Sequence, residues 1–143
     1  MKYEIFTDGS CRGNPGPGGW AGLIIDKETS EKIIVKGGDK DTTNNKMELL
    51  AIIESLQAIP YSEEKQKVKI YSDSSYCVKG ISEWMSGWLK TDFKGKKNVE
   101  LWKRYLEVSK TLDVDIEWVK AHNGHPENEF VDSVAFKEAS KYV

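Results

Sequence analysis

The chain of 143 residues contains only two cysteines, two histidines and four prolines, and it has no long apolar run. A segment that spans a bilayer needs about 20 consecutive apolar residues, and no secretory signal opens the sequence. Cys11 and Cys77 belong to no Cys-x-x-Cys pattern, which favours two free thiols over a disulfide or a cysteine metal pair. We therefore expect no membrane partner and a reducing, cytoplasmic location.

An excess of positive charge is also missing, because 21 basic residues face 23 acidic ones and the net charge is −2. This balance excludes a uniformly basic nucleic-acid-binding protein. The segment 79–104 is the exception, with seven lysines and arginines against three acids. A basic region on an acidic chain suits a protein that holds a polyanion at one place and a cation at another. Taken alone, the same segment would be interpreted as a solvated charged surface.

No repeat, low-complexity tract or linker interrupts the sequence, which predicts one domain over residues 1–143. Apolar periodicity predicts strands over 3–7, 20–25, 32–36, 68–72 and 113–118, and helices that begin at Thr42 or Thr43, near Ser74, at Asn98 and near Pro126. Glycines and prolines predict a turn region over 9–19, and residues 79–97 are expected to be irregular. This order predicts a mixed sheet with helices packed on it.

Four acids occupy positions that favour metal chemistry. Asp8 and Asp73 each follow a strand, where open α/β sheets place their sites, and Glu48 and Asp132 lie in helices. Clustered carboxylates repel one another unless a hard cation such as Mg²⁺ neutralises them, and two such ions can promote phosphodiester hydrolysis. Each acid alone is more often a helix cap or a surface charge.

Four segments carry these acids in order along the chain: TDGSCRGNPGPGGW (7–20), TTNNKMEL (42–49), YSDSSY (71–76) and WVKAHNGHPENEFVD (118–132). Together with GISEW (80–84) and KNVELW (97–102), they resemble the successive motifs of the type 1 ribonuclease H family, the bacterial ribonuclease HI type. The resemblance implies an α/β ribonuclease H-like fold, with three antiparallel strands followed by two parallel to the first, flanked by helices. It also implies hydrolysis of the RNA strand of RNA–DNA hybrids, leaving 5′-phosphate and 3′-hydroxyl ends.

The same resemblance implies the catalytic residues. Asp8, Glu48, Asp73 and Asp132 would bind two Mg²⁺ ions, for which Mn²⁺ can substitute. His122 matches a histidine that assists proton transfer or product release, a task that suits the ordinary pKa of histidine. A zinc site made by His122 and His125 is the alternative, and with two histidines and no nearby cysteine it lacks ligands.

The residues that would hold the hybrid also follow from the resemblance. Cys11, Asn14, Asn44 and Asn45 would line the minor groove, where 2′-hydroxyls mark RNA. Trp84 and Trp88 would receive the DNA strand beside Lys96 and Lys97, and Thr43 and Asn98 match a DNA-phosphate pocket. From the residues alone, Asn14 is a turn residue, Asn44 starts a helix, and two tryptophans four apart indicate core packing.

Three positions depart from the family pattern. Asp41 stands where many members have an arginine of the phosphate pocket, the basic segment between Trp88 and Asn98 is short, and Ser75 replaces a frequent glutamine.

We therefore expect an active, monomeric enzyme whose affinity for the hybrid depends on salt. The alternatives are a hybrid-binding module that has lost catalysis and a nuclease domain of a larger replication or reverse-transcription protein. An interaction domain with an acidic face would instead be independent of Mg²⁺.

Overall fold

The structure is a computed structural model that describes residues 2–120 and 126–143. Its strands are β1 (Lys2–Cys11), β2 (Gly16–Asp26), β3 (Lys32–Thr42), β4 (Gln66–Ser72) and β5 (Leu112–Trp118). Its helices are α1 (Asn44–Gln57), α2 (Ser75–Lys79), the π-helical turn η1 (Gly80–Trp84), α3 (Met85–Lys90), α4 (Val99–Ser109) and α5 (Pro126–Ser140). No helix of the described residues is long and apolar enough to cross a membrane.

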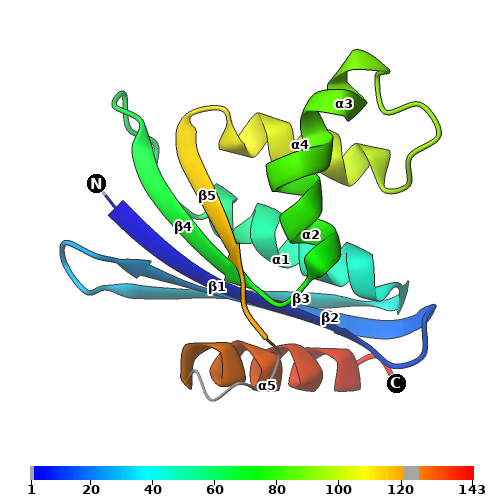
Figure 1. The fold of residues 1–143 in the computed structure, drawn as a ribbon. Coiled ribbons are helices and arrows are strands. Elements are labelled where there is room, and N and C mark those ends of the chain that lie inside the picture. Colours follow the sequence, from blue (N-terminus) through cyan, green and yellow to red (C-terminus); the bar gives the residue numbers. More distant parts are fainter. Residues whose placement is uncertain (1, 121–125) are drawn as a thin grey trace.

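The five strands form one mixed sheet in the order β3-β2-β1-β4-β5 (Figure 1). Strand β1 pairs antiparallel with β2, and β2 pairs antiparallel with β3. Strand β4 lies parallel to β1 on its other side, and β5 lies parallel to β4. The predicted fold, with three antiparallel strands followed by two parallel to the first, is confirmed.

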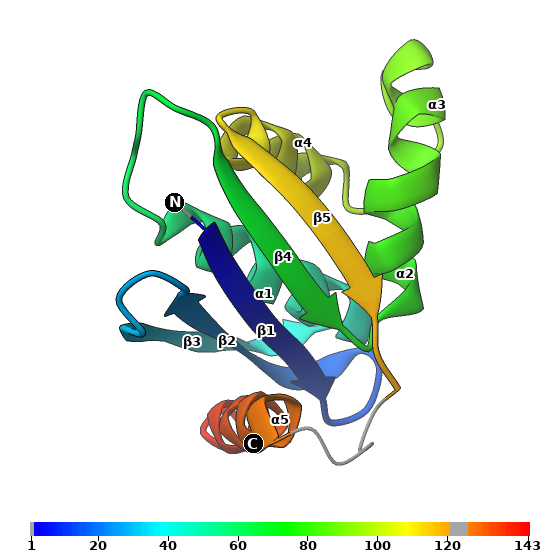
Figure 2. The ribbon, with the colours of Figure 1, turned by 60° about the vertical axis from the view of Figure 1, so that its left-hand side comes forward.

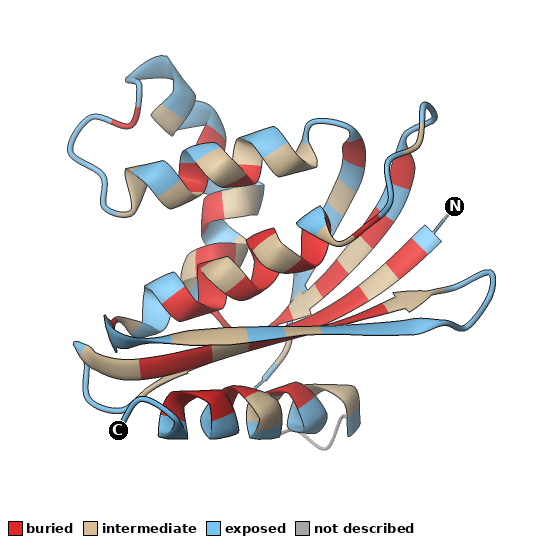
Figure 3. Cartoon of the chain, turned by 180° about the vertical axis from the view of Figure 1, so that it is seen from behind, coloured by how far each residue is buried: buried red, intermediate tan, exposed pale blue. Residues whose placement is uncertain are grey.

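Helices cover the two faces of the sheet unequally, with α5 on one face and the remaining helices on the other (Figure 2). Helix α1 packs on β1 and β2 and against α4, and these elements enclose the larger core, which includes Leu49, Ile52 and Trp102. Helix α5 packs on β2 and β1 over a smaller core around Phe6 and Val131. The burial colours show the buried residues of α1 and α5 turned toward the sheet (Figure 3). The central strands are therefore buried on both faces.

Two of the predicted segments are wrong. The turn region expected over 9–19 is much shorter, because β1 continues to Cys11 and β2 begins at Gly16. Gly19 pairs with Ser10 on one side and Gly38 on the other, so ladder hydrogen bonds override the turn tendency of glycine. Residues 80–90 are helical rather than irregular, because the aromatic side chains there pack against α4.

The two capping predictions have different outcomes. The side chain of Thr43 accepts a hydrogen bond from the backbone N–H of Lys46 at 3.3 Å, so Thr43 caps α1 as predicted. Asn98 precedes α4, also as predicted, but its side chain makes no capping hydrogen bond and its φ is 57°. Its amide is used elsewhere in the structure.

Candidate active site

The parallel pairing of β1 and β4 brings Asp8 and Asp73 together. Phe6 pairs with Tyr71, and two residues further along the chain come Asp8, still within β1, and Asp73, just after β4. Because parallel strands point the same way, both carboxylates reach the same end of the sheet. Asp73 follows the last residue of β4, and the indole Nε1–H of Trp118 donates to its carbonyl oxygen at 3.1 Å. The end of β5 therefore fixes the backbone at Asp73.

Glu48 enters this site from helix α1. The backbone N–H of Gly9 donates to Asp8 Oδ1 at 2.9 Å and also to Glu48 Oε1. A Cβ on Gly9 would lie 2.4 Å from the backbone nitrogen of Glu48, so only glycine allows α1 to approach β1 this closely. The small residue after Asp8 thus decides whether Glu48 can join the two aspartates.

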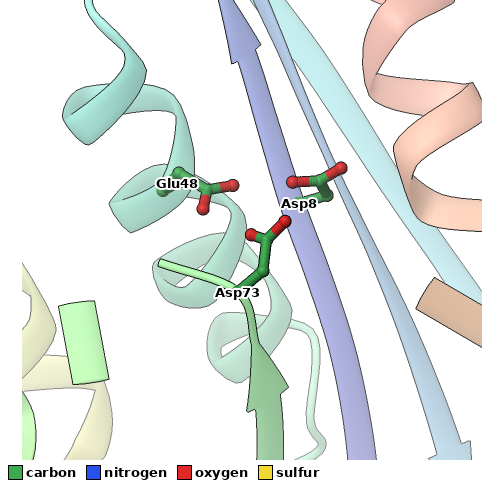
Figure 4. Close-up of side chains that lie close together, drawn as sticks. All are labelled: Asp8, Glu48 and Asp73. Atoms are coloured by element: carbon green, nitrogen blue, oxygen red, sulfur yellow. The ribbon is translucent and has the colours of Figure 1, made fainter. Parts of the chain in front are cut away.

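The three carboxylates converge in space, as Figure 4 shows. One ligand oxygen from each of Asp8, Glu48 and Asp73 can be chosen so that all three lie within 4.8 Å of one another. Burial and the nearby charges of Asp8 and Asp73 raise the pKa of Glu48 well above its usual range. Burial, followed by a hydrogen bond with Asp132, raises the pKa of Asp8 to about 8. Such a cluster of like charges is stabilised by a divalent cation, so the donor set fits a metal site.

Asp132 reaches the site from helix α5, on the opposite face of the sheet from Glu48. It hydrogen-bonds with Asp8 and lines a small cavity of about 10 Å³ together with Thr7, Asp73 and Asn128. Thr7 Oγ1 and Asn128 Oδ1 are buried oxygens without a hydrogen-bond partner in the described part of the chain, and both residues line this cavity. Unpartnered oxygens on residues that line a cavity with Asp8, Asp73 and Asp132 are consistent with a site that takes up a cation and its water.

A cleft of about 290 Å³ opens beside the acids. It is lined by Asp8, Gly9, Asn44, Asn45, Glu48, Asp73, Ser74, Ser75 and Tyr76. Asn14 Oδ1 accepts the backbone N–H of Asn44 at 3.1 Å, so the loop after β1 is tied to the start of α1. The thiol of Cys11 lies 3.3 Å from the carbonyl oxygen of Gly16 and 3.4 Å from that of Thr42. The structure therefore gathers Asn14, Asn44 and Asn45 near the acids, and it holds Cys11 against the neighbouring backbone.

The predicted DNA-strand residues lie in a second region, on η1, α3 and the following loop. The rings of Trp84 and Trp88 have centroids 5.7 Å apart. Trp84 remains 39% exposed, whereas Trp88 packs against Trp102 at 5.2 Å. The ammonium of Lys96 lies 5.9 Å from the centroid of the Trp88 ring, and Lys97 is exposed. The pair is thus partly core and partly surface.

A third hollow, of about 540 Å³, lies where the end of β3, the start of α1 and the start of α4 meet. Its lining includes Asn98 of the predicted phosphate pocket and Lys96, which was predicted to lie beside the DNA strand, together with Asp41 and Thr42. Thr43 is the next residue along the chain and does not line this hollow. Asp39 and Glu100 add two further acids to the lining, so the hollow carries mixed charge rather than a purely basic surface.

His122, Gly124 and His125 lie outside the described residues, so the predicted proton-transfer histidine and the alternative zinc pair stay predictions. Sequence reasoning missed Thr7, Tyr76 and Asn128, which line the cavity and the cleft around the acids. Thr7 and Tyr76 belong to the same motifs as Asp8 and Asp73 and could have been found from that proximity. Asn128 lies one helical turn before Asp132, a spacing that places two side chains on one helix face.

Comparisons with known proteins agree with this geometry. The RNase H family model matches residues 1–140. The chain is 50% identical over 142 residues to a Campylobacter jejuni protein named Ribonuclease HI, covering 99% of this chain and 94% of the relative. These matches define the class as ribonuclease H, and this chain belongs to the ribonuclease H family.

Solved structures show the same fold. LC9-RNase H1, described as a type 1 RNase H with the type 2 active-site motif, superposes with a TM-score of 0.86 at 28% identity, covering 99% of this chain and 74% of that one. LC11-RNase H1, solved in complex with an RNA/DNA hybrid, superposes with a TM-score of 0.62 at 20% identity, covering 97% of both chains. The second likeness concerns the fold alone.

Proposed function

We propose that this protein is an endoribonuclease that hydrolyses the RNA strand of RNA–DNA hybrids and leaves 5′-phosphate and 3′-hydroxyl ends. The observation that carries the proposal is the convergence of Asp8, Glu48 and Asp73, whose ligand oxygens lie within 4.8 Å of one another. Membership of the ribonuclease H family supports the same reaction. The protein is proposed to work as a monomeric single domain in the cytoplasm, and its two free cysteines suit that reducing compartment.

The metal proposed for this site is Mg²⁺, bound as two ions, with Mn²⁺ as a substitute. Asp8, Glu48, Asp73 and Asp132 would hold the ions, because carboxylate oxygens are the ligands that hard cations prefer. When bound, the two ions supply the Lewis acidity that activates water and stabilises the departing 3′-oxygen. The four carboxylates would hold the ions beside the cleft, where the scissile phosphodiester would be positioned. His122 would move a proton to or from the reacting groups.

The cleft beside the acids would select RNA. Asn44 and Asn45 line this cleft, and their amides can both donate hydrogen bonds to a 2′-hydroxyl and accept them from it. Asn14 fixes Asn44 by accepting the backbone N–H of Asn44, and Cys11, which would also line the minor groove, lies against the backbone of Gly16 and Thr42. On the other strand, Trp84, Trp88, Lys96 and Lys97 would contact the DNA backbone, and Thr43 and Asn98 would bind one of its phosphates.

The decisive experiment uses an end-labelled RNA–DNA hybrid with Mg²⁺, with RNA duplex and DNA duplex as controls. We expect cleavage of the RNA strand of the hybrid only, abolished by EDTA and by Asp73→Asn. Folded protein that binds the hybrid yet cleaves nothing at any Mg²⁺ or Mn²⁺ concentration would refute the nuclease and leave a binding module. Cleavage that survives Asp73→Asn would place the reaction elsewhere in the molecule.

A further inference from the structure

Tyr76 connects the acid cleft to the predicted DNA-phosphate pocket. It lies in α2, three residues after Asp73, and lines the cleft beside the acids. Its hydroxyl accepts a hydrogen bond from the side-chain amide of Asn98 at 3.2 Å and another from the indole of Trp102 at 2.8 Å. A phenolic oxygen offers two lone pairs, so these two donors use its full accepting capacity.

The amide of Asn98 is oriented by this contact rather than by its own helix. Asn98 has a left-handed backbone, which disfavours side chains other than glycine, asparagine and aspartate. Its side chain makes no capping bond to α4, although its carbonyl accepts the first helical N–H, from Trp102, at 3.0 Å. The –NH₂ group has two hydrogens, so binding to Tyr76 leaves one for a phosphate oxygen. The hydrogen bond to Tyr76 therefore sets the direction of the second N–H of the Asn98 amide.

Trp102 makes the connection rigid. Its side chain is fully buried, and its ring packs against Tyr76 at 5.6 Å and against Trp88 at 5.2 Å. A Cβ on Gly80 would lie 2.4 Å from Trp102 Cη2, so α2 and η1 contact this ring without a gap. Figure 1 shows α2 and α3 rising from the sheet as one helical rod in front of α4. Tyr76 thus sets the position of the start of α4 relative to the helix that follows Asp73.

We propose that Tyr76 is a positioning residue for the DNA strand: its hydroxyl orients Asn98, and so fixes the phosphate contact relative to the acids. This inference rests on the proposed function. The hydroxyl acts through Asn98 and touches no reacting atom, so it affects substrate binding and leaves the chemical step unchanged. The sequence motif YSDSSY contains Tyr76, but nothing in the motif indicates that its hydroxyl contacts a residue 22 positions away.

Tyr76→Phe tests the proposal because it removes the hydroxyl and keeps the ring. Of the two hydrogen bonds that the substitution removes, the one from Asn98 bears on the DNA contact. We expect KM for the hybrid to rise about fivefold, the effect of losing that one neutral hydrogen bond, with kcat within about twofold of the parent. Tyr105→Phe is the matched control, because Tyr105 is a buried tyrosine whose ring also packs on Trp102 and belongs to the same helix as Trp102. We expect its KM to be unchanged.

A double-variant comparison separates positioning from direct contact. In an Asn98→Ala background, Tyr76→Phe should change KM by less than about twofold, because the residue through which the hydroxyl acts is gone. An unchanged KM in Tyr76→Phe alone, or an equal rise in both backgrounds, would overturn the proposal.

Dissociation constants for the hybrid, measured in an Asp73→Asn background, keep this test separate from that of the nuclease activity. Absence of cleavage by the parent protein would refute the proposed function. In the Asp73→Asn background, equal dissociation constants with and without the Tyr76→Phe substitution would refute the positioning role.

Discussion

Replacing Asp8 by asparagine should stabilise the metal-free protein while it abolishes catalysis. Asp8 is 7% exposed, and burial and the carboxylates of Asp132 and Asp73 raise its pKa from 3.8 to about 8. In the unfolded chain this carboxyl is ionised at neutral pH, whereas in the folded chain it keeps its proton. Folding therefore binds a proton, and the free energy of unfolding falls as pH rises between the two pKa values.

The magnitude follows from that difference in pKa. At pH 7 the carboxyl destabilises the fold by about 4 kcal/mol, because each pKa unit corresponds to about 1.4 kcal/mol. Asparagine does not ionise, but a buried amide that is incompletely hydrogen-bonded costs about 1–3 kcal/mol. The net gain in the free energy of unfolding at pH 7 is therefore expected to be about 1–3 kcal/mol. At pH 5, where the carboxyl costs only about 2 kcal/mol, the gain should approach zero.

Urea denaturation in EDTA, followed by tryptophan fluorescence at pH 5, 7 and 8, measures this effect. Asp113→Asn is the control, because Asp113 is an exposed carboxylate on β5 and its loss should change stability by less than about 0.5 kcal/mol. Added Mg²⁺ should stabilise the parent more than Asp8→Asn, because the variant lacks one ligand. The reasoning is wrong if Asp8→Asn is no more stable than the parent at pH 8, or if their difference is the same at pH 5 and pH 8.

Three further predictions concern other parts of the molecule. Asp41→Arg should tighten hybrid binding, because it replaces one acid of the mixed-charge hollow near Asn98 by a phosphate-binding cation; equal dissociation constants at matched salt would contradict it. Cys77 is fully buried and its pKa is raised to about 12, so iodoacetamide at pH 8 should modify Cys11 and spare Cys77, as peptide mass spectrometry will show. Lys97→Ala should weaken hybrid binding and reduce the slope of log K against log salt by about one, whereas an unchanged slope would remove Lys97 from the interface.

The sequence was sufficient for the parts of the site that depend on strand order. Asp8 lies near the end of β1 and Asp73 directly follows β4, the parallel neighbour of β1, and the carboxyl end of a parallel strand is a recognisable position. Glu48 was less predictable, because its approach depends on the missing side chain of Gly9 opposite the backbone of α1. Local patterns contain no information about such a contact between residues 39 positions apart.

The errors have the same physical origin. The glycines at the start of β2 have turn tendencies that pairing with two neighbouring strands overrides. The helical character of residues 80–90 depends on packing against Trp102, which comes later in the chain. The hydroxyl of Tyr76 meets Asn98 and Trp102 only once α4 has docked. In each case a contact between residues far apart in the sequence decides the structure, and local propensity gives no information about that contact.

The placement of α5, alone on its face of the sheet, has a consequence for when the protein can act. Asp132 is on α5, which is synthesised after every strand, whereas Asp8 is on the first strand. A nascent chain that has folded as far as β5 therefore contains three of the four acids and an uncovered small core around Phe6. Docking of α5 covers that core and brings Asp132 to the other three acids in the same step. The acid site is therefore complete only when the chain has finished folding.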